Sequence, residues 1–178
     1  MISYVISLLF ERFAFRQDLV GWEIFVNKIY IDADACPVKK EVYKVSLRNN
    51  IKVVVVSNGG IRPYNHPLIT MHVVPQGLDM ADNWIAEEVI CNDLVITNDI
   101  PLAARCIDKG ANVIRPDGKK LDTSNIGDIL ASRNLMSDIR SADLFFKGKE
   151  KVFSNKDRSN FLNMLESECQ KLLKQFKN

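Results

Sequence analysis

Short apolar runs alternate with helix-like segments between residues 29 and 115, and this alternation constrains the fold more than any other feature of the chain. The runs are rich in Val and Ile and largely continuous, which is typical of strands buried on both faces of a sheet. We expect these strands at residues 29–31, 51–56, 70–74, 93–97 and 112–114. Strands separated by helices predict a mostly parallel sheet with right-handed crossovers. The sequence therefore predicts an α/β domain with a central sheet of about four or five strands.

Helix signals lie between these runs and dominate the chain after them. We expect helices at residues 37–47, 79–90, 100–109, 123–133, 134–141 and 157–176. Pro37 suits the first turn of the first helix, and Gly110 suits the C-cap of the third. Ser154 is a candidate N-cap of the last helix, with Asp157 three residues later. Residues 29–178 are thus predicted to form one α/β domain with a helical C-terminal region.

Residues 1–28 differ from the rest of the chain. The segment is apolar and aromatic as far as Phe15, but Glu11, Arg12 and Arg16 interrupt it. It lacks the basic start and the small-residue cleavage site of a signal peptide. We interpret residues 1–28 as an N-terminal extension that is not part of the native domain. An added amphipathic helix packed on the domain is the alternative.

Composition excludes several classes of protein. The 178 residues are 47% hydrophobic and 26% charged, which is ordinary for a soluble globular protein. Four scattered cysteines and two histidines form no zinc-binding pattern, so a reduced, cytoplasmic chain is the simplest interpretation. No apolar run approaches the length of a membrane span.

The net charge of +2 is too small to indicate a nucleic-acid partner by itself, but charge is unevenly distributed. Residues 29–110 contain eight Lys or Arg against ten Asp or Glu, a local −2, whereas residues 147–178 contain eight against four, a local +4. An acidic region beside a basic tail favours a polyanionic partner bridged by metal. A solvated lysine face explains the tail equally well.

Five aspartates are placed where the predicted fold would bring them together. Asp32 and Asp34 follow the first strand, Asp99 follows the fourth, and Asp79 and Asp82 open a helix from the same edge. Ligands bind outside the carboxyl ends of strands in open α/β sheets. Two unit charges 4 Å apart repel by roughly 4 kcal/mol at an effective dielectric constant of 20, and Mg²⁺ or Mn²⁺ would relieve that repulsion. Helix capping is the alternative for Asp34, for Asp99 and for the Asp79–Asp82 pair.

Three other polar residues are predicted near the same edge. Asn58 and Thr97 follow the second and fourth strands, and Arg62 lies in the loop after the second. Each could contact a phosphate or a metal-bound water. Turn formation is the alternative for Asn58 and Thr97, and a solvated loop position is the alternative for Arg62.

With these motifs in view, the chain resembles the YaiI/YqxD family of bacterial proteins. The matching stretches are Tyr-Ile-Asp-Ala-Asp-Ala-Cys-Pro at 30–37, Gly-Leu-Asp-Met-Ala-Asp at 77–82, Asp-Leu-Val-Ile-Thr-Asn-Asp-Ile-Pro-Leu-Ala at 93–103 and Asp-Arg-Ser-Asn-Phe at 157–161, with Arg62-Pro63, Arg133 and Arg140. The family is grouped with PIN-like domains, so the resemblance implies a three-layer α/β domain. Two departures are the extra residues 1–28 and the segment 144–153, where the family carries a Gly/Pro-rich stretch.

The resemblance also implies a set of metal-binding residues, because PIN-like nucleases hold Mg²⁺ or Mn²⁺ with acids at these strand ends. Asp32, Asp82 and Asp99 match the catalytic acids of those nucleases. Asp34 and Asp79 would be additional ligands specific to this family.

Three functions stay open. The first is a metal-dependent nuclease acting on RNA, with Arg62 and the lysines at 147, 149 and 151 holding the backbone. The second is a phosphatase of the haloacid dehalogenase type, in which Asp32 is the nucleophile and Asp34 the acid or base. The third is a non-catalytic domain that binds metal or nucleic acid.

Overall fold

The structure is a computed structural model that describes residues 27–34, 36–142 and 152–175. Its elements in order are β1 (Ile29–Asp32), α2 (Lys39–Arg48), β2 (Val53–Ser57), β3 (Ile69–Val73), α3 (Met80–Glu88), β4 (Leu94–Ile96), α4 (Ile100–Asp108), β5 (Asn112–Ile114), β6 (Lys120–Leu121), α5 (Ile126–Ala142) and α6 (Asn155–Gln175). The prediction for the N-terminal extension falls outside the described residues except at positions 27 and 28. The three lysines at 147, 149 and 151 lie outside them as well.

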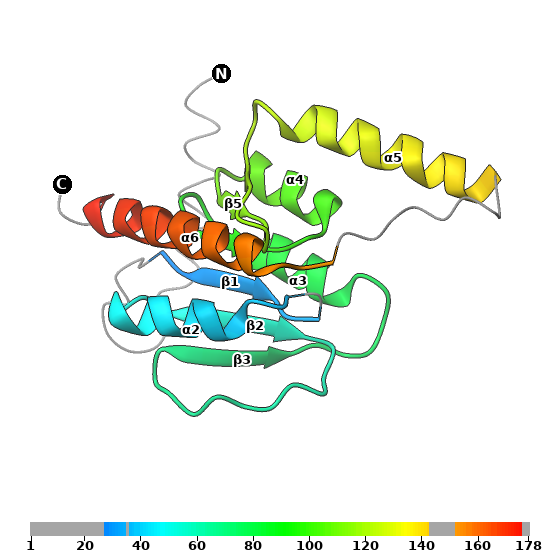
Figure 1. The fold of residues 1–178 in the computed structure, drawn as a ribbon. Helices are drawn as coiled ribbons and strands as arrows, with labels where there is room; N and C mark the ends of the chain where they lie inside the picture. The colour runs from blue at the N-terminus through cyan, green and yellow to red at the C-terminus, as the bar shows by residue number, and fades with distance from the viewer. Residues whose placement is uncertain (1–26, 35, 143–151, 176–178) are drawn as a thin grey trace, which may run out of the picture.

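The strands form one six-stranded sheet in the order β3-β2-β1-β4-β5-β6 (Figure 1). All neighbouring strands are parallel except β5 and β6, which are antiparallel. The chain adds β2 and β3 on one side of β1 and then crosses to add β4 on the other side. Strand order therefore reverses between β1 and β4, and such a switch point opens a crevice at the carboxyl ends of the two strands.

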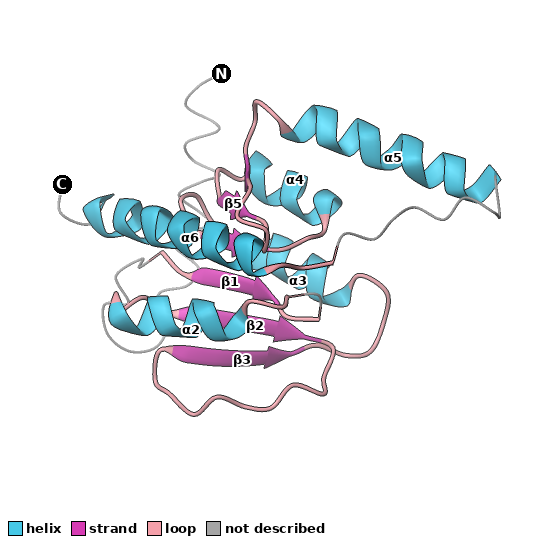
Figure 2. Cartoon of the chain, in the orientation of Figure 1, coloured by secondary structure: helices cyan, strands magenta, loops and turns pink. Residues whose placement is uncertain are grey.

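Helices cover both faces of the sheet and make a three-layer α/β domain (Figure 2). Alternate strand residues supply the two cores, because successive side chains point to opposite faces. Ile29 and Ile31 pack with α2 and α6, which contribute Val42 and Phe161. On the other face, Tyr30 packs with the helices α3 and α4. The continuous apolar runs in the sequence are thus explained by burial on both sides.

The predicted fold class is confirmed, with local corrections. All five predicted strands form, but β6 was missed because its two residues are too short to produce a pattern. The helices predicted at 123–133 and 134–141 are one helix, α5, because no Gly or Pro interrupts the chain where they were divided. The first helix begins at Lys39 instead of Pro37.

The predicted N-cap of the last helix, Ser154, is confirmed. Ser154 Oγ accepts a hydrogen bond from the Asp157 backbone N–H at 3.2 Å, and the Asp157 carboxylate accepts one from the Ser154 N–H at 3.0 Å. This reciprocal arrangement is a capping box with Asp in place of Glu. None of the helices within the described ranges is long and apolar enough to cross a bilayer.

Candidate functional site

The floor of the candidate site is Asp32, the last residue of β1. Asp32 is only 7% exposed, and its neighbour across the switch point is Thr97, just after β4. Thr97 Oγ1 donates a hydrogen bond to Asp32 Oδ2 at 2.9 Å and accepts one from the Asp99 N–H at 2.9 Å. Burial raises the pKa of Asp32, the Thr97 hydrogen bond lowers it, and the charges of Asp34 and Asp99 raise it. Thr97 therefore stabilises the ionised form of a carboxylate that its surroundings disfavour.

Asp34 is held from the end of β2. Its Oδ1 accepts a hydrogen bond from Ser57 Oγ at 2.9 Å, and its Oδ2 accepts one from the Asn58 N–H at 3.1 Å. The alternative that Asp34 caps the following helix is wrong, because Val38 is the N-cap residue and makes no side-chain cap bond. The Asp34 carboxylate instead links the segment after β1 to the end of β2.

Asp99 has a structural role in addition to its place in the site. It is the N-cap of α4, and its Oδ1 accepts a hydrogen bond from the Leu102 N–H at 2.8 Å. The capping interpretation is therefore confirmed for this residue. Its Oδ2 lies 3.9 Å from a guanidinium nitrogen of Arg133 on α5. That long contact links α5 to the rim of the site.

Asp79 and Asp82 lie at the start of α3. Asp79 is the N-cap residue but has φ +55°, in the left-handed region, and makes no side-chain cap bond. The predicted capping box between the two is therefore wrong, since a capping residue normally has extended backbone that turns its side chain toward the helix. Burial raises the pKa of Asp82 to about 6, and the charges of Asp32, Asp99 and Asp79 contribute to that shift.

These residues surround one cleft of about 360 Å³, which we call the acidic cleft. All five predicted metal ligands line it, namely Asp32, Asp34, Asp79, Asp82 and Asp99. Of the three predicted substrate-binding residues, Asn58 lines it as well. Thr97 is 1% exposed and lies behind Asp32, so it can orient the acid but cannot reach a substrate. Arg62 is exposed and does not line the cleft.

Two residues of this region, Asn98 and Arg133, were not among the predicted site residues. Asn98, which lies in the sequence between the two predicted residues Thr97 and Asp99, lines the cleft. Arg133 reaches Asp99 from a helix that begins some 27 residues further along the chain. No local pattern signals such a contact, because it depends on how α5 packs across α4.

The ligand chemistry of the acidic cleft suits a hard cation. Every polar side chain lining it offers a carboxylate or amide oxygen, the donors that Mg²⁺ and Mn²⁺ prefer. Across the described part of the chain, however, no three acidic, His or Cys side chains form a ready-made metal-binding group. Carboxylates must therefore rotate inward for several of them to contact one ion.

Comparison with known proteins assigns the family. The chain matches the family described as uncharacterised BCR, YaiI/YqxD, over residues 30–171. It belongs to that family. A UPF0178 protein of Cereibacter sphaeroides is 52% identical over 146 residues, which cover 82% of this chain and 90% of the relative. Relatives in Roseobacter denitrificans and Rhodopseudomonas palustris are 51% and 48% identical, covering 97% and 92% of their own lengths.

No solved structure matches this chain. The family assignment confirms the resemblance on which the expected domain was based, and the matched region contains all five acids of the cleft. The names of the relatives state no activity, so the chemistry of this YaiI/YqxD protein has to be argued from the cleft itself.

Proposed function

We propose that this YaiI/YqxD protein is a Mg²⁺- or Mn²⁺-dependent nuclease acting on RNA, and that the acidic cleft is its reaction centre. The observation that carries the proposal is the convergence of five aspartates from three separate segments on one cleft at the switch point of the sheet. The resemblance to PIN-like domains, whose nucleases use acids at these strand ends, supports the same function.

The electrostatics of the cleft support cation binding. The pKa of Asp82 rises to about 6 through burial and then through the neighbouring acids, with Arg105 opposing the shift. Burial and the charges of Asp34 and Asp99 raise the pKa of Asp32. Carboxylates that destabilise one another in this way gain free energy when a cation enters. Arg133 lies 3.9 Å from Asp99 and offsets part of that repulsion.

The roles of the acids are those that the resemblance to PIN-like nucleases implies. Asp32, Asp82 and Asp99 would hold the cation, with Asp34 and Asp79 completing the set. Once bound, Mg²⁺ or Mn²⁺ supplies an activated water and neutralises charge on the phosphate that is attacked. Thr97 orients Asp32 through its hydrogen bond, and the cap bond from Leu102 fixes Asp99. Asn58 and Asn98 can donate hydrogen bonds from their amide groups to phosphate oxygens at the edge of the cleft.

A cleavage assay on a labelled, unstructured RNA with added Mn²⁺ tests the proposal. The most informative variant is Asp99→Asn, because Asn caps helices as well as Asp and removes only the charge. Cleavage should fall by more than about 100-fold, beyond the loss caused by changing outer partners of metal ligands. Asp108→Asn removes an exposed acid at the end of α4, outside the cleft, and should leave the rate unchanged.

One observation favours a second candidate, a non-catalytic domain that binds metal or nucleic acid. Asp99 caps α4 and Asp34 ties two turns together, so both acids have structural roles that need no reaction. In that case the purified protein should not cleave RNA with either cation, and Asp99→Asn should alter neither cleavage nor stability. Cleavage that copurifies with the protein and persists in Asp99→Asn would indicate a contaminating nuclease and would also contradict the proposal.

A further inference from the structure

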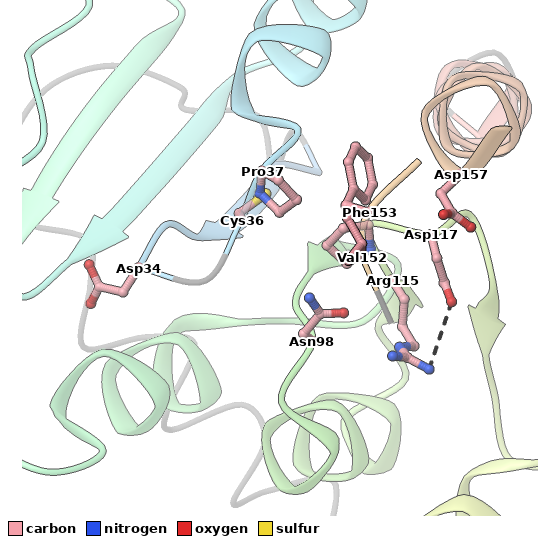
Figure 3. A pocket seen from close by; sticks show the side chains of 10 residues that line it. Asp34, Cys36, Pro37, Asn98, Arg115, Asp117, Val152, Phe153 and Asp157 are labelled. Carbon is pink, nitrogen blue, oxygen red and sulfur yellow. Dashed lines mark ion pairs between the residues drawn. The ribbon is translucent and has the colours of Figure 1, made fainter. Parts of the chain in front are cut away.

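The acidic cleft does not end at its own acids. Asp34 and Asn98 also line a second cavity of about 500 Å³, which we call the arginine pocket (Figure 3). Asp117 and Asp157 of that pocket in turn line a third cavity of about 690 Å³, which we call the lysine pocket. Because they share lining residues, the three cavities make a series of neighbours from the switch point of the sheet to the face of α6.

Among the residues that the structure describes, Arg115 is the only cationic side chain that lines the arginine pocket. Its Nε is buried and has no hydrogen-bond partner among the described residues. Its Nη1 lies 3.9 Å from Asp117 Oδ2, too far for a hydrogen bond. A guanidinium with five donors in a planar fork is suited to phosphate oxygens, and no described residue takes up its Nε donor. This unused capacity is the observation that points to an anionic ligand.

Beside Arg115 and three aspartates, apolar side chains line the arginine pocket. Phe153, Pro37 and Cys36 face the cavity near Asn98 (Figure 3). The guanidinium carbon of Arg158 lies 5.5 Å from the centroid of the Phe153 ring, which helps to hold that ring in place. An aromatic ring beside a phosphate-binding arginine is a combination that proteins use for unpaired nucleotides.

The lysine pocket adds positive charge further along the series. Lys119 and Lys156 line it and are exposed. The two acids there are already engaged, since Asp157 accepts hydrogen bonds from Ser154 and Asp117 Oδ1 accepts one from the Lys119 N–H at 3.2 Å. Lys119 Nζ lies 4.0 Å from Asp117 Oδ2, too far for a hydrogen bond, and the exposed ammonium groups of both lysines can reach a polyanion although the formal charges of the cavity balance.

Gly118 allows the turn between Arg115 and Lys119 to pack closely against α6. It has φ +84°, and a Cβ at this position would lie 2.6 Å from the Asn160 carbonyl carbon of α6. Only glycine allows the turn between β5 and β6 to approach the helix backbone this closely. Arg115 and Lys119, on either side of Gly118, are thereby positioned against α6.

We propose that the three cavities form one track for a single strand of nucleic acid, with Arg115 binding a backbone phosphate, Phe153 contacting a base, and Lys119 and Lys156 binding the phosphates beyond. The placement of the cleaved bond at the acidic cleft rests on the proposed function. The strand is single because a base can pack against Phe153 only when it is unpaired. The volume of the arginine pocket lies within the range of cavities that hold small organic ligands.

Fluorescence anisotropy with a labelled oligouridine RNA tests the track without any chemistry. The strand should be about 12 nucleotides long, within the usual site sizes of single-strand grooves, and EDTA excludes cleavage. Affinity is measured across a salt series for wild type, Arg115→Gln and Lys119→Gln/Lys156→Gln. The slope of log affinity against log salt should flatten by about 0.7 for the arginine variant and about 1.4 for the double variant. Phe153→Leu should weaken binding about equally at every salt concentration, since it removes no charge.

The matched control is Lys44→Gln/Lys174→Gln, which removes two exposed lysines that line none of the three cavities. The proposal is overturned if this control changes the slope as much as Lys119→Gln/Lys156→Gln does. Absence of wild-type binding at low salt, or duplex RNA binding as tightly as the single strand, would overturn it as well. Weakened binding in the track variants of a protein that never cleaves RNA would support the track and contradict the nuclease. If the protein cleaves RNA and the track variants bind RNA like wild type, the nuclease is supported and the track is contradicted.

Discussion

The acids that follow strands differ from the acids that begin α3 in how the protein holds them. Asp32, Asp34 and Asp99 each accept hydrogen bonds, from Thr97, Ser57 and the Leu102 N–H among others. Asp79 makes no side-chain cap bond, and burial and neighbouring charges are the main causes of the raised pKa of Asp82. The strand-end acids are thus fixed by the core, whereas the helix-start acids are positioned mainly by their backbone. A site built this way combines a rigid half with a half that can adjust to a ligand.

Breaking the rigid half should have the largest effect on stability. Thr97→Val keeps the shape of the side chain but removes the donor to Asp32 and the acceptor for the Asp99 N–H. Losing a buried hydrogen bond to a charged group should cost about 2 kcal/mol of unfolding free energy near neutral pH. The cost should shrink in acid, where Asp32 is protonated and needs the donor less. Urea denaturation at several pH values measures this, and Thr97→Ser, which keeps both bonds, should behave like wild type.

The cap at Asp99 separates structure from charge within the same half. Asp99→Ala should lower the unfolding free energy by about 1 kcal/mol, because the Leu102 N–H loses its partner. Asp99→Asn should remain close to wild type in stability, since its side-chain oxygen can accept the same bond. Thermal unfolding of the two variants side by side checks the distinction. Equal losses in both would show that the negative charge, and not the cap, stabilises α4.

Among the acids that begin α3, Asp82→Asn should increase the free energy of unfolding at neutral pH but not in acid. The pKa of Asp82 is raised to about 6 in the folded protein, so the folded state holds this proton more tightly than the unfolded state does. Stability in EDTA should therefore fall as pH rises from about 4 to about 6 in wild type, and less so in Asp82→Asn. Because Asp82 is partly exposed, the gain at neutral pH should be at most about 1 kcal/mol. A variant equally stable relative to wild type at pH 4 and pH 7 would contradict the raised pKa.

The central sheet could be predicted from the sequence because each buried strand carries its own signal. Ile29–Asp32 and Val53–Ser57 are continuous apolar runs that end in polar residues, so both the strands and the edge where they meet were predictable. The two-residue strand β6 has no such run, and its pairing with β5 depends on the turn at Gly118. Short elements fixed by tertiary contacts leave no pattern of their own.

The same distinction applies to the candidate site. The grouping of the five aspartates followed from the parallel sheet. The predicted capping roles of Asp34 and Asp79 were wrong, because N-cap residues look alike in sequence and differ in backbone geometry. Asp99 did prove to be a cap. Arg115 was not among the predicted site residues, since its unpartnered Nε donor becomes visible only when its neighbours in the fold are known.

Isothermal titration of the protein with Mn²⁺ tests most directly whether the two halves form one metal site. Wild type should bind Mn²⁺ stoichiometrically, and Asp32→Asn and Asp82→Asn, one from each half, should each weaken binding by at least about 10-fold. Asp108→Asn, an exposed acid outside the cleft, should bind like wild type. Wild-type protein that binds no Mn²⁺, or Mn²⁺ binding that neither cleft variant alters, would contradict the account.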